Sequence, residues 1–437
     1  LNITANSPID GLEITQSGAG NGLHVTGTTD LVGNTTLTGS IAVSGDYSST
    51  TAGTSNLRLG VNAGNSIASG GNYNVVVGDE AGTAITTGDA NTFYGYSAGV
   101  ATTTSSDNTA IGGAALATNI LASSNTAVGK NALYAHNVGS AASTYNTAVG
   151  HHAGIAVTTG TNNTLIGGLA GDAITTGTSN NAVGYAALGA TTTATQNNAF
   201  GRNSLGSNTT GADNTAFGQN TLGANTTASN NTAVGSDALA ANTTGANNVA
   251  VGATAGSALT TGSQNVLIGE KAGDALTTAS DNVVMGRSAL GSDTLGSKSV
   301  AIGRSALFTQ NFTSATDTYN TAVGYGAGQS VTTGVQNTLI GSAAGDALTV
   351  GVRNVAVGYD SLSSDTQGSK SIAIGRSALA TQNFTSATDA YNVAVGDYAG
   401  ALVTTGTLNT LIGGLAGDAI TTGVRNTTMG YASGGQL

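Results

Sequence analysis

A glycine that follows an apolar residue, usually with an asparagine four positions before it, recurs 22 times between Gly60 and Gly430. Most of the intervals between these anchor glycines equal the step from Gly150 to Gly167; one is longer by a single position and three are longer by four. A repeat of about 17 residues cannot contain a helix pair or a propeller blade, but it matches one coil of a β-solenoid. We therefore expect an all-β chain in which each repeat contacts only its neighbours.

Residues 163–177 illustrate how one coil is built. The apolar pair Leu165 and Ile166, preceded by a threonine, is typical of a short strand. Gly167 can adopt the positive φ that a sharp turn requires, and Gly177 can open a second turn after a second short strand at 173–176. The pattern predicts a parallel β-solenoid or β-roll with coils of about 17 residues. Because neighbouring strands lie about 4.8 Å apart, 22 coils would extend roughly 105 Å.

The asparagine four positions before the anchor glycine is present in 20 of the 22 repeats, with serine at Ser299 and Ser371. Stacked asparagine side chains can hydrogen-bond along a solenoid, and asparagine tolerates the turn that leads into a strand. We expect this column to be a structural ladder.

Composition narrows the classes of function. Only 8% of the residues are charged, but hydrophobic residues reach 39% and fall in register with the repeat, which disordered tracts do not show. The net charge of −11 argues against a nucleic-acid partner, and the chain has no cysteine for disulfide or thiol chemistry. Since no apolar run is long enough to cross a bilayer, we expect no membrane insertion.

The strand of each repeat carries two adjacent apolar residues. The residue directly before the anchor glycine is apolar throughout, and the one before that is apolar in 20 of 22 repeats. Since adjacent strand residues point to opposite faces, one should fill the coil and the other should form an apolar stripe outside it. A stripe along the whole solenoid exceeds what a soluble monomer exposes, so another copy of the chain should cover it. Alternatively, a bend at the glycine buries both residues in one coil. Under the first interpretation, the candidates for packing between chains are Leu165, Leu267, Leu339 and Leu411.

The repeat also resembles known families. The segment 231–239, Asn-Thr-Ala-Val-Gly-Ser-Asp-Ala-Leu, is similar to the head repeats of trimeric autotransporter adhesins. The longer segment 242–252 is more similar to repeats of bacteriophage tail-fibre shafts. The resemblance covers about residues 56–434 and implies a left-handed parallel β-roll assembled as a homotrimer, used as a spacer or display surface. The adhesins usually have shorter coils than the repeat found here.

Residues 1–55 have a different pattern. Segments 11–15 and 22–27 form a paired motif that resembles repeats of phage fibre proteins, and apolar residues then recur at every sixth position from Leu31 to Val43. This spacing fits a slender β-helix or β-prism. We therefore expect two parts: a thin stalk over 1–55 and a β-roll of 22 coils over 56–437.

Three repeats carry four extra residues, at 133–146, 307–320 and 379–392, and the last two are nearly identical. Insertions in solenoids usually emerge as surface loops. Their aromatic residues are candidates for contact with a host glycan or receptor, or they pack back over the coil or onto a neighbouring chain. These residues are Tyr145, Phe312, Tyr319, Phe384 and Tyr391.

No pattern indicates catalysis, a cofactor or a metal. His151 and His152 are adjacent on an expected turn, without an acidic pair at ligand spacing. The aspartates that share one repeat position, such as Asp172 and Asp274, lie several coils apart. We therefore expect no enzymatic activity.

The function expected from these patterns is that of a structural fibre shaft of a phage virion, which spaces or presents a receptor-binding region. Its partners would be copies of itself and other fibre or baseplate proteins at its ends. The alternative is an autotransporter-type adhesin or extracellular filament on the bacterial surface. A more distant alternative is an ice-binding solenoid, suggested by recurrent Thr-Thr-Gly as at 260–262.

Overall fold

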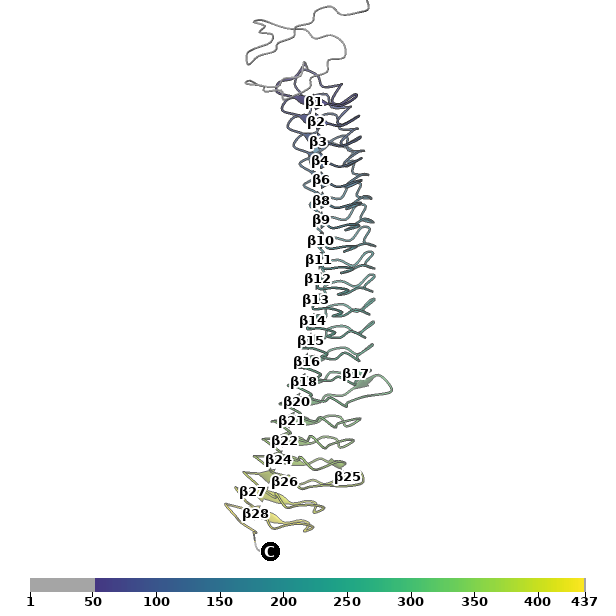
Figure 1. Cartoon of the computed structure of the whole chain (residues 1–437). Coiled ribbons are helices and arrows are strands. Elements are labelled where there is room, and N and C mark those ends of the chain that lie inside the picture. The colour runs from purple at the N-terminus through teal and green to yellow at the C-terminus, as the bar shows by residue number, and fades with distance from the viewer. Residues whose placement is uncertain (1–51, 436–437) are drawn as a thin grey trace, which may run out of the picture. The chain divides into compact units, whose positions relative to one another are not determined.

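The computed structural model describes residues 52–435, which stack as 22 coils and contain no helix. Each coil contributes one three-residue strand to a single parallel sheet of 22 strands, from β1 (Leu57–Leu59) to β28 (Thr427–Met429). Figure 1 shows these strands one above the other. The predicted parallel β-solenoid, with one coil for each sequence repeat, is therefore confirmed. The stalk predicted for 1–55 lies, except for its last four residues, outside the described residues.

Between β1 and β28 this sheet contains β2 (Val75–Val77), β3 (Thr92–Tyr94), β4 (Thr109–Ile111), β6 (Thr126–Val128), β8 (Thr147–Val149), β9 (Thr164–Ile166), β10 (Asn181–Val183), β11 (Asn198–Phe200), β12 (Thr215–Phe217), β13 (Thr232–Val234), β14 (Val249–Val251), β15 (Val266–Ile268), β16 (Val283–Met285), β18 (Val300–Ile302), β20 (Thr321–Val323), β21 (Thr338–Ile340), β22 (Val355–Val357), β24 (Ile372–Ile374), β26 (Val393–Val395) and β27 (Thr410–Ile412). Three small two-stranded sheets pair β5 (Ala122–Ser123) with β7 (Ala142–Ser143), β17 (Gly296–Ser297) with β19 (Thr316–Asp317), and β23 (Gly368–Ser369) with β25 (Thr388–Asp389).

The strands pair in register with the sequence repeat. Leu165 pairs with Ala182, and Ala182 pairs with Ala199, one repeat later in each case. Equivalent positions of successive coils therefore form straight columns along the sheet.

Burial alternates along each three-residue strand. The middle residue is buried in every strand of the large sheet except β1, whereas the first and third residues are partly or largely exposed. The alternation predicted from strand geometry is confirmed, and the alternative in which both apolar neighbours are buried is wrong.

The choice of interior residue was also wrong. Leu165, Leu267, Leu339 and Leu411 are the middle residues, are fully buried in the coils of their own chain, and cannot pack between chains. The second residue of each strand points into the coil, and the third, directly before the anchor glycine, points outward.

These leucines fit inside because a glycine leaves room for them. Gly171, four residues after its anchor, has φ +56°, and a Cβ there would lie only 2.7 Å from a methyl carbon of Leu165. Every leucine in the middle of a strand has a glycine at this position of its coil. Most coils with alanine in mid-strand instead carry a buried leucine there, such as Leu188 with Ala182. Different coils thus place their large core side chain at one of two positions, and the core volume is filled in both cases.

The asparagine ladder is confirmed. Asn163 donates from its backbone N to Asn146 Oδ1 at 3.0 Å and from Nδ2 to the same oxygen at 3.2 Å. Its Nδ2 also donates to the carbonyl of Gly177 at 2.9 Å, across the coil. Equivalent bonds recur along most of the stack, so these buried polar side chains are satisfied.

The second strand expected at 173–176 is absent, and this segment contains the end of a turn and a bend at Thr175 and Thr176. The Thr175 backbone N donates to Thr192 O at 2.9 Å, but the Thr175 hydroxyl also donates to Thr192 O, at 3.2 Å. Mixed side-chain and backbone bonding replaces a regular ladder on this side of the coil.

Candidate functional site

The outward side of the large sheet is the most extensive candidate surface. We call it the outer sheet face and define it as the first and third residues of the 22 strands given above. None of these 44 residues is charged. The third residue is apolar in every strand, and the first is threonine in eleven strands, aliphatic in nine and asparagine in two.

Many apolar side chains of this face are well exposed. Exposed fractions are 36% for Val149, 38% for Ile340 and 57% for Phe217. Because the strands are in register, the third residues form one continuous apolar column, and the first residues form a second column of threonine, aliphatic residues and two asparagines. The face extends over about 105 Å and is about 10 Å wide, which gives roughly 1,000 Å² of uncharged surface.

The three insertions form surface loops, as Figure 1 shows beside β17. Thr313, Ser314 and Ala315 are exposed at the tip of the second insertion. Phe312 and Phe384, candidates for contact with a glycan or receptor, are only 6% exposed and pack back over their own coils. For these two residues the contact interpretation is wrong, and packing over the coil is correct. Their backbone is fixed over the buried aspartate of the loop: Phe384 N donates to Asp365 Oδ1 at 3.2 Å, and the Phe312 N–H donates to Asp293.

The three tyrosines of the insertions are exposed, at 61% for Tyr145, 53% for Tyr319 and 48% for Tyr391. Each has a positive φ of 51–52°, at the position before the buried asparagine, where other coils carry mostly polar residues. A bulky residue rarely adopts this conformation without a structural cause.

Two of these tyrosines belong to equivalent charged clusters. Lys370 Nζ lies 2.6 Å from Asp389 Oδ2, 3.0 Å from the Tyr391 hydroxyl and 5.0 Å from the centre of its ring. The same arrangement joins Lys298, Asp317 and Tyr319.

The first insertion has the tyrosine without the charges. Ser124 and Ser143 take the places of the lysine and aspartate, with their hydroxyl oxygens 3.3 Å apart. The charged pair is therefore a feature of the second and third insertions.

Under each insertion lies a buried polar cluster that the repeat pattern did not indicate. Gln310 Nε2 donates to Asp293 Oδ2 at 2.6 Å and to Ser299 Oγ at 3.0 Å. Burial raises the pKa of Asp293, opposed by the hydrogen bond from Gln310 and by backbone N–H donors. Gln310 also accepts from Asn320 at 2.8 Å, so it joins the two sections of the asparagine ladder interrupted at Ser299.

His136 occupies the place of Gln310 in the first insertion. Its Nε2 lies 2.9 Å from Thr144 Oγ1, and burial lowers its pKa to about 4. The ring is therefore neutral at physiological pH and serves as a polar core residue.

His151 and His152, the remaining histidines of the described part of the chain, do not form a metal centre. The His151 and His152 rings stack at 3.8 Å, and His152 Nε2 lies 3.1 Å from Asn131 Nδ2. Among residues 52–435, no three histidine, aspartate or glutamate side chains gather where they could hold a metal ion. The same residues include no helix that could span a membrane.

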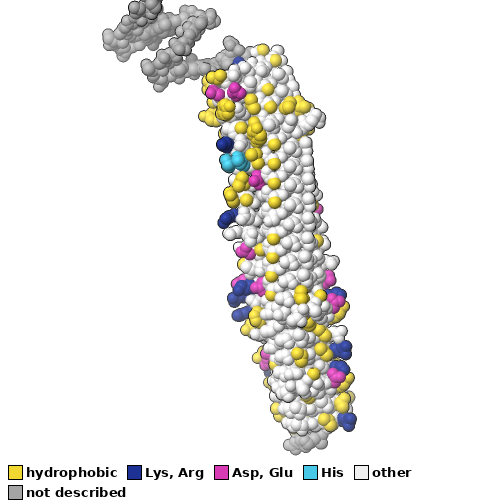
Figure 2. Space-filling view, turned by 90° about the vertical axis from the view of Figure 1, so that its right-hand side faces the viewer, with side chains coloured by type: hydrophobic (Ala, Val, Ile, Leu, Met, Phe, Trp, Pro, Cys, Tyr) yellow, Lys and Arg dark blue, Asp and Glu magenta, His cyan; other side chains and the backbone are white. Residues whose placement is uncertain are grey.

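Figure 2 shows one side of the stack on which charges are few and lie mainly along the two edges. On the side of the Thr-Thr pairs, the first threonine is already engaged, since the Thr260 hydroxyl donates to Thr277 O at 3.1 Å.

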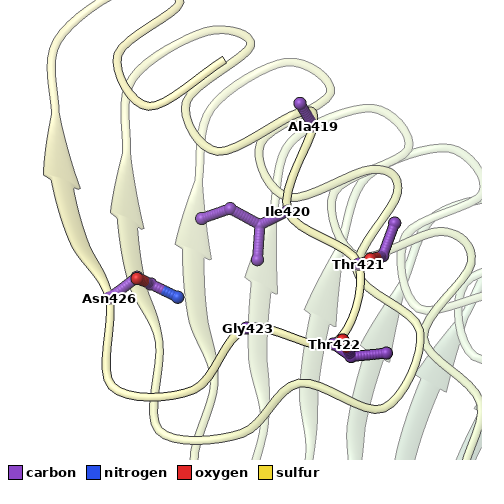
Figure 3. Close-up of a pocket in the computed structure, with 6 residues that line it drawn as sticks. All are labelled: Ala419, Ile420, Thr421, Thr422, Gly423 and Asn426. Carbon is purple, nitrogen blue, oxygen red and sulfur yellow. The ribbon is translucent and has the colours of Figure 1, made fainter. Parts of the chain in front are cut away.

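A hollow lies at the last described coils, lined by Ala419, Ile420, Thr421, Thr422, Gly423 and Asn426. Figure 3 shows Ile420 and Asn426 pointing into the interior of the coil. Equivalent residues elsewhere, such as Ile174 and Asn180, contact the next coil and are fully buried. The hollow is thus a continuation of the core and has no feature of a ligand site.

Comparison with known proteins gave no match: no family model, curated protein sequence or solved structure is similar to this chain.

Proposed function

We propose that this chain is a non-enzymatic shaft subunit that associates with copies of itself through the outer sheet face. The observation that carries the proposal is the absence of charge from all 44 residues of this face, in a sheet of 22 strands. Association would remove the continuous apolar column of this face from water, which is the main favourable term in association.

The resemblance to phage fibre repeats suggests which kind of assembly the chain forms. A homotrimer with the three outer sheet faces around a common axis would be a fibre shaft of a phage virion, joined at its ends to other fibre or baseplate proteins. Its role would be to space or present a receptor-binding region. The absence of charge from the packing face and the engagement of the buried polar groups by the ladders support a mechanical role.

The test is the solution mass of the full chain, measured by light scattering coupled to size exclusion. The expected result is three times the chain mass of 42.1 kDa, unchanged in high salt because the interface has no ion pairs. The mass of a single chain at micromolar concentration would contradict the proposal.

The exposed tyrosines favour a second candidate, an adhesin-type surface that binds a host glycan or receptor itself. Tyr145, Tyr319 and Tyr391 lie on loops and are 61%, 53% and 48% exposed. Binding of the chain to a glycan array, lost on changing these three residues to serine but retained in Tyr185→Ser, would support this candidate. Equal binding by both variants would contradict it.

A further inference from the structure

The outer sheet face repeats itself at every coil. From β2 to β27 its third-residue column is apolar and its first-residue column is mostly threonine or valine, and successive strands are stacked at one fixed spacing. Two such faces slid past each other by one or more coils would retain most of their apolar contacts. Self-association through this face therefore requires some feature that distinguishes one register from another.

Two adjacent strands carry such a feature. Among the 44 residues of the outer sheet face, asparagine occurs only at Asn181 in β10 and Asn198 in β11. Asn181 Nδ2 donates to Asn198 Oδ1 at 2.7 Å. Within residues 52–435, Asn181 Oδ1 and Asn198 Nδ2 have no other hydrogen-bond partner, and both side chains are partly exposed.

An aromatic pair marks the same level of the face. Phe200 lies two residues after Asn198 on the same strand, and its ring stacks on that of Phe217 with centres 5.4 Å apart. The middle of the face thus combines the amide pair with its only two phenylalanines, flanked along the first column by Thr164 and Thr215.

We propose that Asn181 and Asn198 fix the axial register in which copies of this chain associate. The inference rests on the proposed function, and the partner that covers the outer sheet face is a second copy of the chain. A copy has the same spacing between strands and the same uncharged columns. The roughly 1,000 Å² of the face is close to the about 800 Å² per partner that a stable interface buries.

The physical reason is the cost of burying an amide without a partner. In register, the free amide groups of neighbouring copies lie at one level and can hydrogen-bond to each other. After a slip of one coil, one of the two amides of each copy faces a threonine of its neighbour, and one of the two phenylalanines opposes a valine. After a slip of two coils or more, every amide faces a threonine or an aliphatic residue, and neither phenylalanine opposes another phenylalanine. A polar residue buried in an otherwise apolar interface selects register and lowers stability, as a single asparagine does in coiled coils.

The test uses the natural absence of cysteine from the chain. Val323→Cys and Ile340→Cys place thiols on the outer sheet face one coil apart, far from the asparagines. Copies carrying one or the other cysteine are mixed by refolding and treated with a short bifunctional thiol reagent. Each cysteine is introduced into three forms of the chain. One is otherwise unchanged, one carries both Asn181→Val and Asn198→Val, and the matched control carries both Thr164→Val and Thr215→Val.

In the unchanged and control backgrounds, crosslinks between identical positions should dominate. In the double asparagine variant, crosslinks between 323 and 340 should rise from a trace to an amount comparable with the in-register product, while the thermal midpoint of the oligomer rises. An oligomer whose crosslinks are unchanged by the double asparagine variant would overturn this inference alone. A monomeric mass in the unchanged background would overturn the proposed function and the inference with it.

Discussion

Asn231 is bonded to Asn214 of the preceding coil twice through one oxygen: Asn214 Oδ1 accepts from the Asn231 backbone N at 3.0 Å and from its Nδ2 at 3.3 Å. The same Nδ2 also donates to Gly245 O at 2.9 Å, across its own coil. Asn231 Oδ1 in turn accepts from the Asn248 backbone N of the following coil, so a single side chain connects three successive coils.

Replacing Asn231 with alanine should destabilise the stack locally. The Asn248 N–H and the Gly245 carbonyl would lose their partners in a buried environment, which costs about 3 kcal/mol in the free energy of unfolding. Hydrogen exchange should show faster exchange of the Asn248 amide, and the urea midpoint should fall. Thr244→Ala, at an exposed neighbouring site, is the control. Equal midpoints for the two variants would show that the ladder contributes little.

The glycine that accommodates each mid-strand leucine gives a second prediction. Gly345 has φ +55°, and a Cβ there would lie 2.8 Å from a methyl carbon of Leu339. Gly345→Ala should therefore lower the free energy of unfolding by about 2 kcal/mol, from backbone strain and overpacking. Leu339→Ala alone should cost about 3 kcal/mol through the cavity it leaves.

The double variant separates these two causes. If the clash with Leu339 matters, Gly345→Ala should cost about 1 kcal/mol less when residue 339 is already alanine. Chemical denaturation of the four proteins in this cycle measures the coupling. Strict additivity would mean that the cost at Gly345 comes from the backbone alone.

The architecture could be predicted from sequence because the repeat is strict. The anchor glycines, the strands before them and the asparagine ladder all follow from local rules that act in every coil. The interior residue could not be chosen by the same rules, since Leu165 and Ile166 are equally suited to a core. The decisive signal was the glycine at Gly171, whose missing side chain leaves room for Leu165.

The insertions show a different limit. Tyr319 is exposed, but Phe312, seven positions earlier, is buried. Its place depends on the return path of a loop over the buried Asp293, and no periodic pattern in the sequence determines that path. The buried clusters around Gln310 and His136 could not be predicted, because each occurs once per insertion and resembles an ordinary polar loop residue.

His136 should make the stack sensitive to acid. Burial lowers its folded-state pKa from 6.5 to about 4, so between these values the unfolded chain binds more protons than the folded one. The free energy of unfolding should therefore fall as the pH drops from about 6.5 to 4, by up to about 3 kcal/mol.

His136→Gln should remove this dependence, because glutamine already occupies the equivalent positions at Gln310 and Gln382. Denaturant midpoints at pH 7 and pH 4.5 measure the effect, and His151→Gln at an exposed site is the control. The same acid-dependent loss in both variants would mean that another group is responsible.

Charge placed on the outer sheet face should separate assembly from folding. Val251→Asp and Val323→Asp change outward residues of β14 and β20, which remain in contact with water in an isolated chain. Their carboxylates would be buried without partners in the assembly, so the oligomer should dissociate while the circular dichroism of the folded stack is retained. Leu267→Asp and Leu339→Asp place the same charge on fully buried middle residues of the neighbouring strands β15 and β21. These two variants should unfold or aggregate instead. Light scattering and circular dichroism on the two pairs distinguish the outcomes, and an undiminished oligomer mass in the outward pair would show that copies of the chain associate through some other surface.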